Sequence, residues 1–175
     1  MLRRFGTHLK RLGREERGSV LVEMTLITPL MIALSAGVFE FGNLIHKKLL
    51  IEAGLRDAAR YYARCNESLF SDAGLSIDCD ANAQNIAFYG NVAGTGDARV
   101  DGWAPGETGV TFTFNYDTVA AVDGGGNRLY RSSGPNVVVV RIDTSFPYTG
   151  TSLLGYLGLS PITLNAAHEE RTIGW

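Results

Sequence analysis

One acidic side chain stands at the edge of a long apolar run and is the first candidate for chemistry. Residues 24–39 carry no charge, and Glu23 directly precedes them. On insertion scales a carboxylate in a membrane-spanning helix costs about 2.5–3.5 kcal/mol at the centre and less near the interface. We therefore expect Glu23 either to have a partner or a function, or to reach the headgroups from an interfacial position.

The other titratable residues do not form a recognisable active site. The glycine-rich stretches at 94–97 and 124–127 lack the lysine and the strand-to-helix context of a phosphate loop. The aspartates of residues 72–80 lack EF-hand spacing. Three histidines lie in no motif with metal-ligand spacing: His8, His46 and His168. We therefore predict a protein that is not an enzyme and that holds no metal or cofactor.

Charge is distributed unevenly along the chain. The net charge of −2 argues against a strongly basic nucleic-acid binder. Residues 1–18 hold six basic and two acidic side chains, a balance of +4, whereas the remaining residues hold ten basic and sixteen acidic side chains, a balance of −6. A basic head before an apolar segment places the N-terminus on the cytoplasmic side of a membrane.

The apolar run has the length of a membrane anchor once its flanks are included. Sixteen uncharged residues reach roughly 24 Å as a helix, short of a hydrocarbon core of about 30 Å. Extension to residues 19–45 makes the segment long enough to span. A buried core helix of a soluble protein and a secretory signal peptide, with small residues before a cleavage site near residues 36–38, are the alternatives.

Three residues are expected to shape the spanning helix. Pro29 lacks the N–H that would bond to the carbonyl of Thr25, which predicts a local kink or break. Ala33 and Gly37 form a pair of small residues one turn apart, which permits close approach of a second helix in lipid. The alternative for this pair is the ordinary small-residue content of a membrane helix.

The junction before the apolar run resembles a known processing signal. Residues 14–23 read REERGSVLVE, which resembles the processing site of class III, or prepilin-type, signal sequences. The positions of Pro29, Gly37 and the Glu-Phe-Gly of residues 40–42 are similar to the start of TadE-like minor pilins (pseudopilins) of the Tad/Flp tight-adherence system. The resemblance covers residues 14–64 and implies that a prepilin peptidase cleaves between Gly18 and Ser19.

The resemblance also implies a role for Glu23. Cleavage would leave an α-amine on Ser19 that is mostly charged at neutral pH. Ser19 and Glu23 are four residues apart, on one helix face. Glu23 could pair with its own amine or with that of a neighbouring subunit; the family implies the neighbour's, which would set the axial register between subunits.

The family further implies the partners and location of the protein. It would help to initiate or organise assembly of a Tad-type adhesive pilus, with the prepilin peptidase, other Tad pseudopilins, the major Flp pilin and the inner-membrane assembly platform as partners. It would cross the inner membrane once, with a periplasmic body. Two other interpretations stay open: a secreted soluble binding module or hydrolase, and a membrane-anchored periplasmic protein unrelated to pili.

The rest of the chain predicts a small body after the helix. Cys65 and Cys79 form an even pair that suggests a disulfide if the body is exported, with two free thiols as the alternative. The strongest strand signal is residues 136–146, where four valines suggest a central strand buried on both faces and Pro147 ends it. Other expected elements are strands at 110–116 and 162–173, a helix at 82–89 and a helical turn at 151–159.

These patterns predict an α+β, pilin-like fold, with a long N-terminal transmembrane helix packed on an antiparallel sheet of three or four strands. The helix would continue through residue 64, with an apolar stripe that includes Ile51 and Leu55 and a row of charged side chains on another face. The expected segments are a basic leader at 1–18, a transmembrane half-helix at 19–45, a periplasmic amphipathic half-helix at 46–64, a disulfide-clipped loop region at 65–109 and the sheet region at 110–175.

Overall fold

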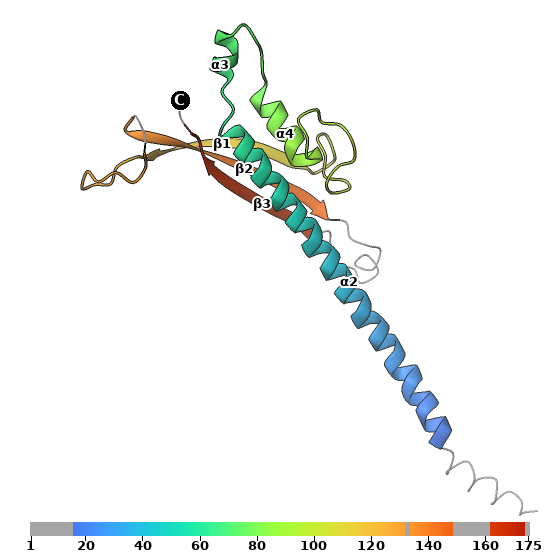
Figure 1. Ribbon diagram of the computed structural model, residues 1–175. Helices are drawn as coiled ribbons and strands as arrows, with labels where there is room; N and C mark the ends of the chain where they lie inside the picture. The colour runs from blue at the N-terminus through green and yellow to red at the C-terminus, as the bar shows by residue number, and fades with distance from the viewer. Residues whose placement is uncertain (1–15, 132–133, 149–161, 174–175) are drawn as a thin grey trace, which may run out of the picture. The chain divides into compact units, whose positions relative to one another are not determined.

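A single long helix forms the N-terminal part of the described chain (Figure 1). The computed structural model describes residues 16–131, 134–148 and 162–173, so most of the predicted leader lies outside the described residues. Helix α2 spans Glu16–Tyr62 and continues through Pro29 without interruption. The chain divides into two compact units, Met1–Gly42 and Asn43–Trp175, and the boundary falls within α2.

The first unit holds the apolar part of α2. Side chains of residues 18–35 are all exposed, and the most apolar window of the helix has no buried residue. A helix that is apolar all round and uncovered by its own protein needs an apolar environment. Among the described residues, one helix is therefore long and apolar enough to cross a membrane, and it lies near the N-terminus.

The second unit contains a three-stranded antiparallel sheet in the order β1-β2-β3. The strands are β1 at Thr111–Ala120, β2 at Asn136–Tyr148 and β3 at Ile162–Arg171. Ile142 in the central strand pairs with Phe114 on one side and with His168 on the other. The long helix and this sheet confirm the predicted α+β class.

The core of the body lies between one face of the sheet and the second half of α2. Ile51 and Leu55 of α2 are almost completely buried, as are Val140 and Ile142 of β2, and all four belong to one hydrophobic cluster. The apolar stripe predicted on the helix is therefore the surface that the body covers.

Two expectations for β2 are wrong. Val138 is 41 % exposed, so the valine run is not buried on both faces; from residue 140 onward burial alternates along the strand, because only one face of the sheet is covered. The strand also continues through Pro147. The N–H of Ser145 bonds toward β1 at Thr111, so the N–H that Pro147 lacks points to the same side, where β1 has not begun.

The region between α2 and β1 contains two short helices, and the rest of it is turns and irregular chain. α3 spans Glu67–Asp72, which the sequence analysis did not predict, and α4 spans Cys79–Tyr89, three residues longer than expected. Asn66 caps α3 by accepting a hydrogen bond from the Leu69 N–H. Asp78 caps α4 in the same way. The helical turn predicted at 151–159 lies outside the described residues.

Candidate functional site

The residues proposed for cleavage and register lie in the first turns of α2. Because α2 begins at Glu16, the bond between Gly18 and Ser19 is inside the helix. A Cβ added to Gly18 would meet no atom within 4 Å, so this position is open. Ser19 and Glu23 are both exposed and lie one turn apart. Among the described residues, Glu23 forms no ion pair, which leaves its carboxylate available to a partner.

The residues around Pro29 use their hydroxyls locally. The hydroxyl of Thr25 donates to the Val22 carbonyl at 2.8 Å, and that of Thr28 donates to the Met24 carbonyl at 2.6 Å. Both side chains therefore hide their polar atoms against the helix, as an apolar environment requires. Neither hydroxyl bonds to the Thr25 carbonyl, which faces the missing N–H of Pro29. The kink itself stays a prediction.

The pair of small residues leaves space on the helix surface. Ala33 and Gly37 are exposed, and a Cβ added to Gly37 would meet no atom within 4 Å. Neighbouring side chains are large and exposed: Leu34 is 59 %, Val38 73 % and Phe39 79 % exposed. A second helix could approach closely at the pair and contact these side chains on either side.

The two cysteines join the end of α2 to the start of α4. Cys65 and Cys79 form a disulfide, with their Cα atoms 5.9 Å apart. Helix α3 lies within the loop that the bond closes, and its Glu67 accepts a hydrogen bond from the Cys79 N–H at 3.0 Å. Helix α3 has no buried residue, so the disulfide is the covalent link that holds it to the body.

A charged network covers part of the sheet face that points away from the core. Arg141 contacts Asp143 at 3.0 Å and Glu169 at 2.8 Å, and Asn115 donates to Asp143 at 2.9 Å. The hydrogen bonds from Arg141 hold the pKa of the Asp143 carboxyl below its usual range. The network cross-links the three strands.

A separate group of hydrogen bonds joins the hydroxyls of Tyr62 and Tyr116 to the carboxylate of Asp80. The Tyr116 hydroxyl lies 2.8 Å from that of Tyr62 and 3.2 Å from the Asp80 carboxylate. Burial, followed by the hydrogen bond with Tyr116, raises the pKa of Tyr62 far above its usual range. Both hydroxyls therefore stay protonated at neutral pH and serve as hydrogen-bonding groups that connect α2, α4 and β1.

Two of the residues considered for metal binding take part in other hydrogen bonds. Asp78 caps α4, and Asp80 bonds to Tyr116. His46 is exposed on α2 and His168 lies in β3, while His8 is outside the described residues. Within the described ranges, no group of three or more histidine, cysteine or carboxylate side chains could hold a metal ion.

Residues 18–60 match the family of TadE-like proteins. The match begins at the glycine of the candidate cleavage site and ends two residues before the end of α2, so it includes Glu23, Pro29 and the small-residue pair. The resemblance to TadE-like proteins is thereby confirmed over this segment. It stops before the disulfide and the sheet. No curated protein and no solved structure matches the chain.

Proposed function

We propose that the protein is a minor pilin, or pseudopilin, that helps to initiate or organise assembly of a Tad-type adhesive pilus. The observation that supports this most directly is the TadE-like match over residues 18–60, which starts at Gly18. The family is related to Tad pili, and the matched segment is the apolar helix rather than the folded body. The helix is therefore the assembly element of the proposal.

Glu23 carries the proposed chemistry of assembly. Removal of residues 1–18 would create a cationic amine on Ser19, and the carboxylate of Glu23 would lie one turn away in the same apolar surroundings. Each charge lowers the cost of the other in lipid. When helices pack side by side, an ion pair between the Ser19 amine of one subunit and Glu23 of the next would favour one axial offset, because other offsets do not allow this pair between subunits.

The small-residue pair and the exposed apolar surface would provide the packing between these helices. Ala33 and Gly37 allow two backbones to approach, which increases van der Waals contact in a medium that supplies no hydrophobic driving force. The leader would lie in the cytoplasm and the body in the periplasm. The Cys65–Cys79 disulfide is compatible with that oxidising compartment.

The proposed partners follow from these steps. A prepilin peptidase would cut between Gly18 and Ser19, other Tad pseudopilins and the major Flp pilin would pack against the helix, and an inner-membrane platform would extract the subunit. The first test is the N-terminus of the protein extracted from native membranes, by intact mass. The proposal expects a start at Ser19 in the membrane fraction and an uncut chain in the Gly18→Leu variant.

Other N-termini would refute the proposal. A start near residues 36–38 in the soluble fraction would indicate a conventional signal peptide and a secreted module. An uncut Met1 in cells that contain the peptidase would leave an ordinary anchored protein.

The register role of Glu23 needs a separate test. Glu23→Gln should leave processing and membrane insertion intact but lower the number of pili per cell, because the Ser19 amine of the neighbour loses its counter-charge. The matched control is Glu52→Gln, which changes a carboxylate of the same helix that pairs only with exposed Lys48 at 3.9 Å. Equal pilus numbers in both variants and the wild type would eliminate the register role.

A further inference from the structure

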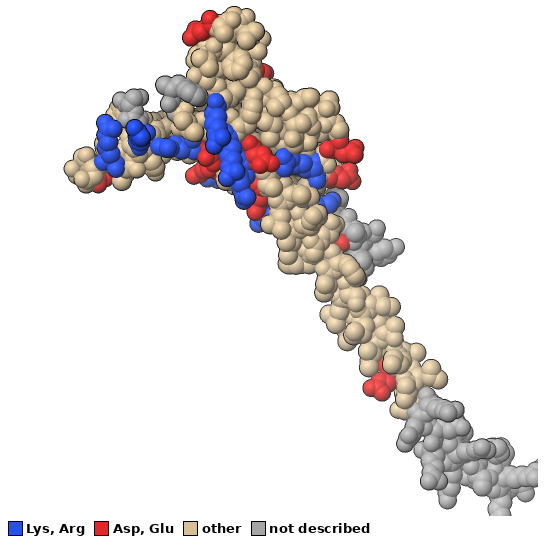
Figure 2. All heavy atoms as spheres, viewed as in Figure 1, with Lys and Arg blue, Asp and Glu red and all other residues tan. Residues whose placement is uncertain are grey.

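Three arginines form a row along the body end of α2. Arg56, Arg60 and Arg64 follow one another at steps of four residues and are all exposed. Figure 2 shows basic side chains gathered over this end of the helix. We call these three residues the basic strip. On sequence grounds a row of this kind is most simply a solvated helix face, and the structure adds two observations that this explanation does not account for.

The first observation is that the arginines of the basic strip form no ion pairs within the described residues. The sequence order favours an ion pair from Glu52 to Arg56, but Glu52 lies 3.9 Å from Lys48 instead. Within the described residues, none of the three arginines forms an ion pair. Like charges one turn apart on a helix destabilise it by a few tenths of a kcal/mol per pair. An anionic partner would remove this repulsion.

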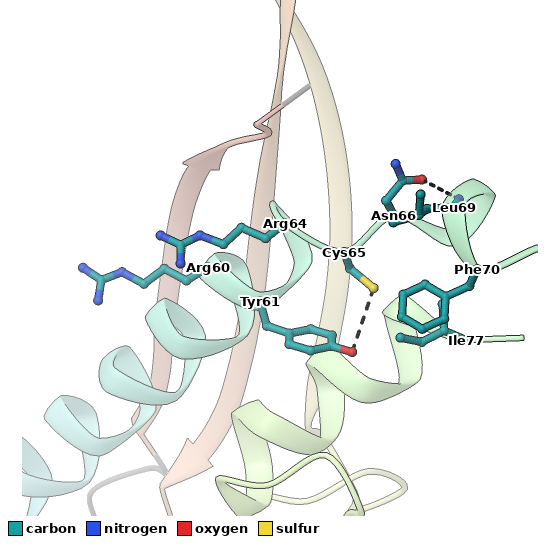
Figure 3. A pocket seen from close by; sticks show the side chains of 8 residues that line it. All are labelled: Arg60, Tyr61, Arg64, Cys65, Asn66, Leu69, Phe70 and Ile77. Carbon is teal, nitrogen blue, oxygen red and sulfur yellow. Dashed lines mark hydrogen bonds between the residues drawn. The ribbon is translucent and has the colours of Figure 1, made fainter. Parts of the chain in front are cut away.

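The second observation is an apolar pocket directly beside the basic strip. It has a volume of about 380 Å³, and the stems of Arg60 and Arg64 form part of its wall. The remaining lining residues are Tyr61, Cys65, Asn66, Leu69, Phe70 and Ile77. In Figure 3 the side chains of Tyr61, Cys65, Phe70 and Ile77 gather on one side, while the two guanidinium groups lie next to each other and point away from them.

The pocket is made by the segment that the disulfide closes. Leu69 and Phe70 come from α3, a helix with no buried residue, and Leu69 is 59 % exposed. The disulfide between Cys65 and Cys79 holds α3 next to Tyr61 of α2. The protein thus fixes exposed apolar side chains beside unpaired guanidinium groups, and the two together select a ligand that is both apolar and acidic.

The position of the surface favours a protein over a lipid headgroup. Arg60 follows Lys47, the first charged residue after Glu40, by thirteen residues, which is about 20 Å along a helix. Electrostatic attraction to an anionic membrane fades within a Debye length of about 8 Å at physiological ionic strength. If the ligand were a lipid, its acyl chain would have to leave the bilayer to fill the apolar pocket.

We propose that the basic strip and its pocket bind an acidic segment of a neighbouring protein outside the membrane. One apolar side chain of the partner would fill the pocket between Tyr61 and Phe70. Its carboxylates would lie against the guanidinium groups of Arg60 and Arg64, each able to accept two hydrogen bonds from an arginine. The inference goes beyond the proposed assembly role and concerns a surface of the body, separate from Glu23 and from the small-residue pair Ala33 and Gly37.

The test is site-specific photo-crosslinking from the pocket in the full chain. A benzophenone amino acid replaces Leu69, and the protein is crosslinked in native membranes before the attached peptide is identified by mass spectrometry. We expect a protein crosslink whose peptide contains aspartate or glutamate. Raising salt from about 0.05 to about 0.5 M should weaken it, because exposed ion pairs are screened.

Charge reversal provides the specific control. The Arg60→Glu/Arg64→Glu variant should reduce the crosslink by about tenfold, whereas Arg128→Glu/Arg131→Glu makes the same change of net charge in the β1–β2 connection and should leave it within about twofold. Reversing the partner's acidic residue to arginine should restore the crosslink in the first variant, which also shows that the variant folds.

Several results would overturn the inference. These are a crosslink to lipid, a protein crosslink that neither salt nor the Arg60→Glu/Arg64→Glu change affects, a crosslinked peptide without acidic residues, or no crosslink at all. None of these results depends on pilus number or on the mature N-terminus, so failure here is distinguishable from failure of the proposed function.

Discussion

Gly54 marks a close approach of α2 to α4 and to Trp103. A Cβ added there would lie 2.6 Å from the carbonyl oxygen of Ala87 in α4, and 3.1 and 3.2 Å from Cη2 and Cζ3 of Trp103. Ala87 and Trp103 are completely buried. The contact is with a backbone oxygen, which cannot rotate away as the end of a side chain can. Gly54→Ala therefore forces α2 and α4 apart.

Two opposing terms determine the size of the effect. Alanine in place of glycine in a helix interior stabilises the helix by about 1 kcal/mol. Overpacking a close-packed interior costs about 1–3 kcal/mol. Because the clash at Gly54 involves the backbone of α4 and the buried ring of Trp103, we expect the upper part of that range. The net loss for Gly54→Ala should be about 1–2 kcal/mol.

The assay is urea unfolding of the full chain in detergent micelles, followed by tryptophan fluorescence, since Trp103 is buried in the native body. The matched control is Gly42→Ala in the same helix, where an added Cβ meets no atom within 4 Å and only the helix term applies. It should leave stability unchanged or raise it by up to about 1 kcal/mol. If Gly54→Ala were as stable as Gly42→Ala, the close packing of α2 on α4 would be refuted.

Two further predictions concern the body. Replacing Cys65 and Cys79 with alanine should lower the free energy of unfolding by about 3 kcal/mol, the chain-entropy value for a loop of about 15 residues. The replacement should also speed hydrogen exchange in α3. Equal urea midpoints for the oxidised and the reduced wild type would contradict this prediction. Asp143, whose pKa Arg141 holds low, contributes stability that is present above about pH 4 and lost as pH falls through its folded pKa. Asp143→Asn should therefore be less stable than wild type at pH 7 and should approach it below about pH 4; a difference in melting temperature that is independent of pH would exclude this.

The sequence alone was sufficient for the long helix and for its resemblance to TadE-like proteins over residues 18–60. The features that identify the segment are local ones: the basic leader, Gly18, Glu23 and Pro29. Their interpretation depends on spacing along one helix rather than on packing. The same holds for the apolar stripe at Ile51 and Leu55, since helical periodicity alone predicts which face is buried. The asparagine and aspartate caps at residues 66 and 78 were further local signals, and they could have located α3 and α4.

Tertiary structure decided the features that depend on neighbours distant in sequence. Pro147 remains in β2 because β1 starts too late to need its N–H. Val138 is exposed although it shares a face of the strand with buried Val140, because the cover of that face does not extend to it. The clash at Gly54 depends on a carbonyl of residue 87. Propensity and periodicity describe a residue and its local turn, whereas these outcomes follow from strand register and from which elements a fold brings into contact. For the same reason, only the structure placed two arginines of a helix beside an apolar pocket built by a later segment.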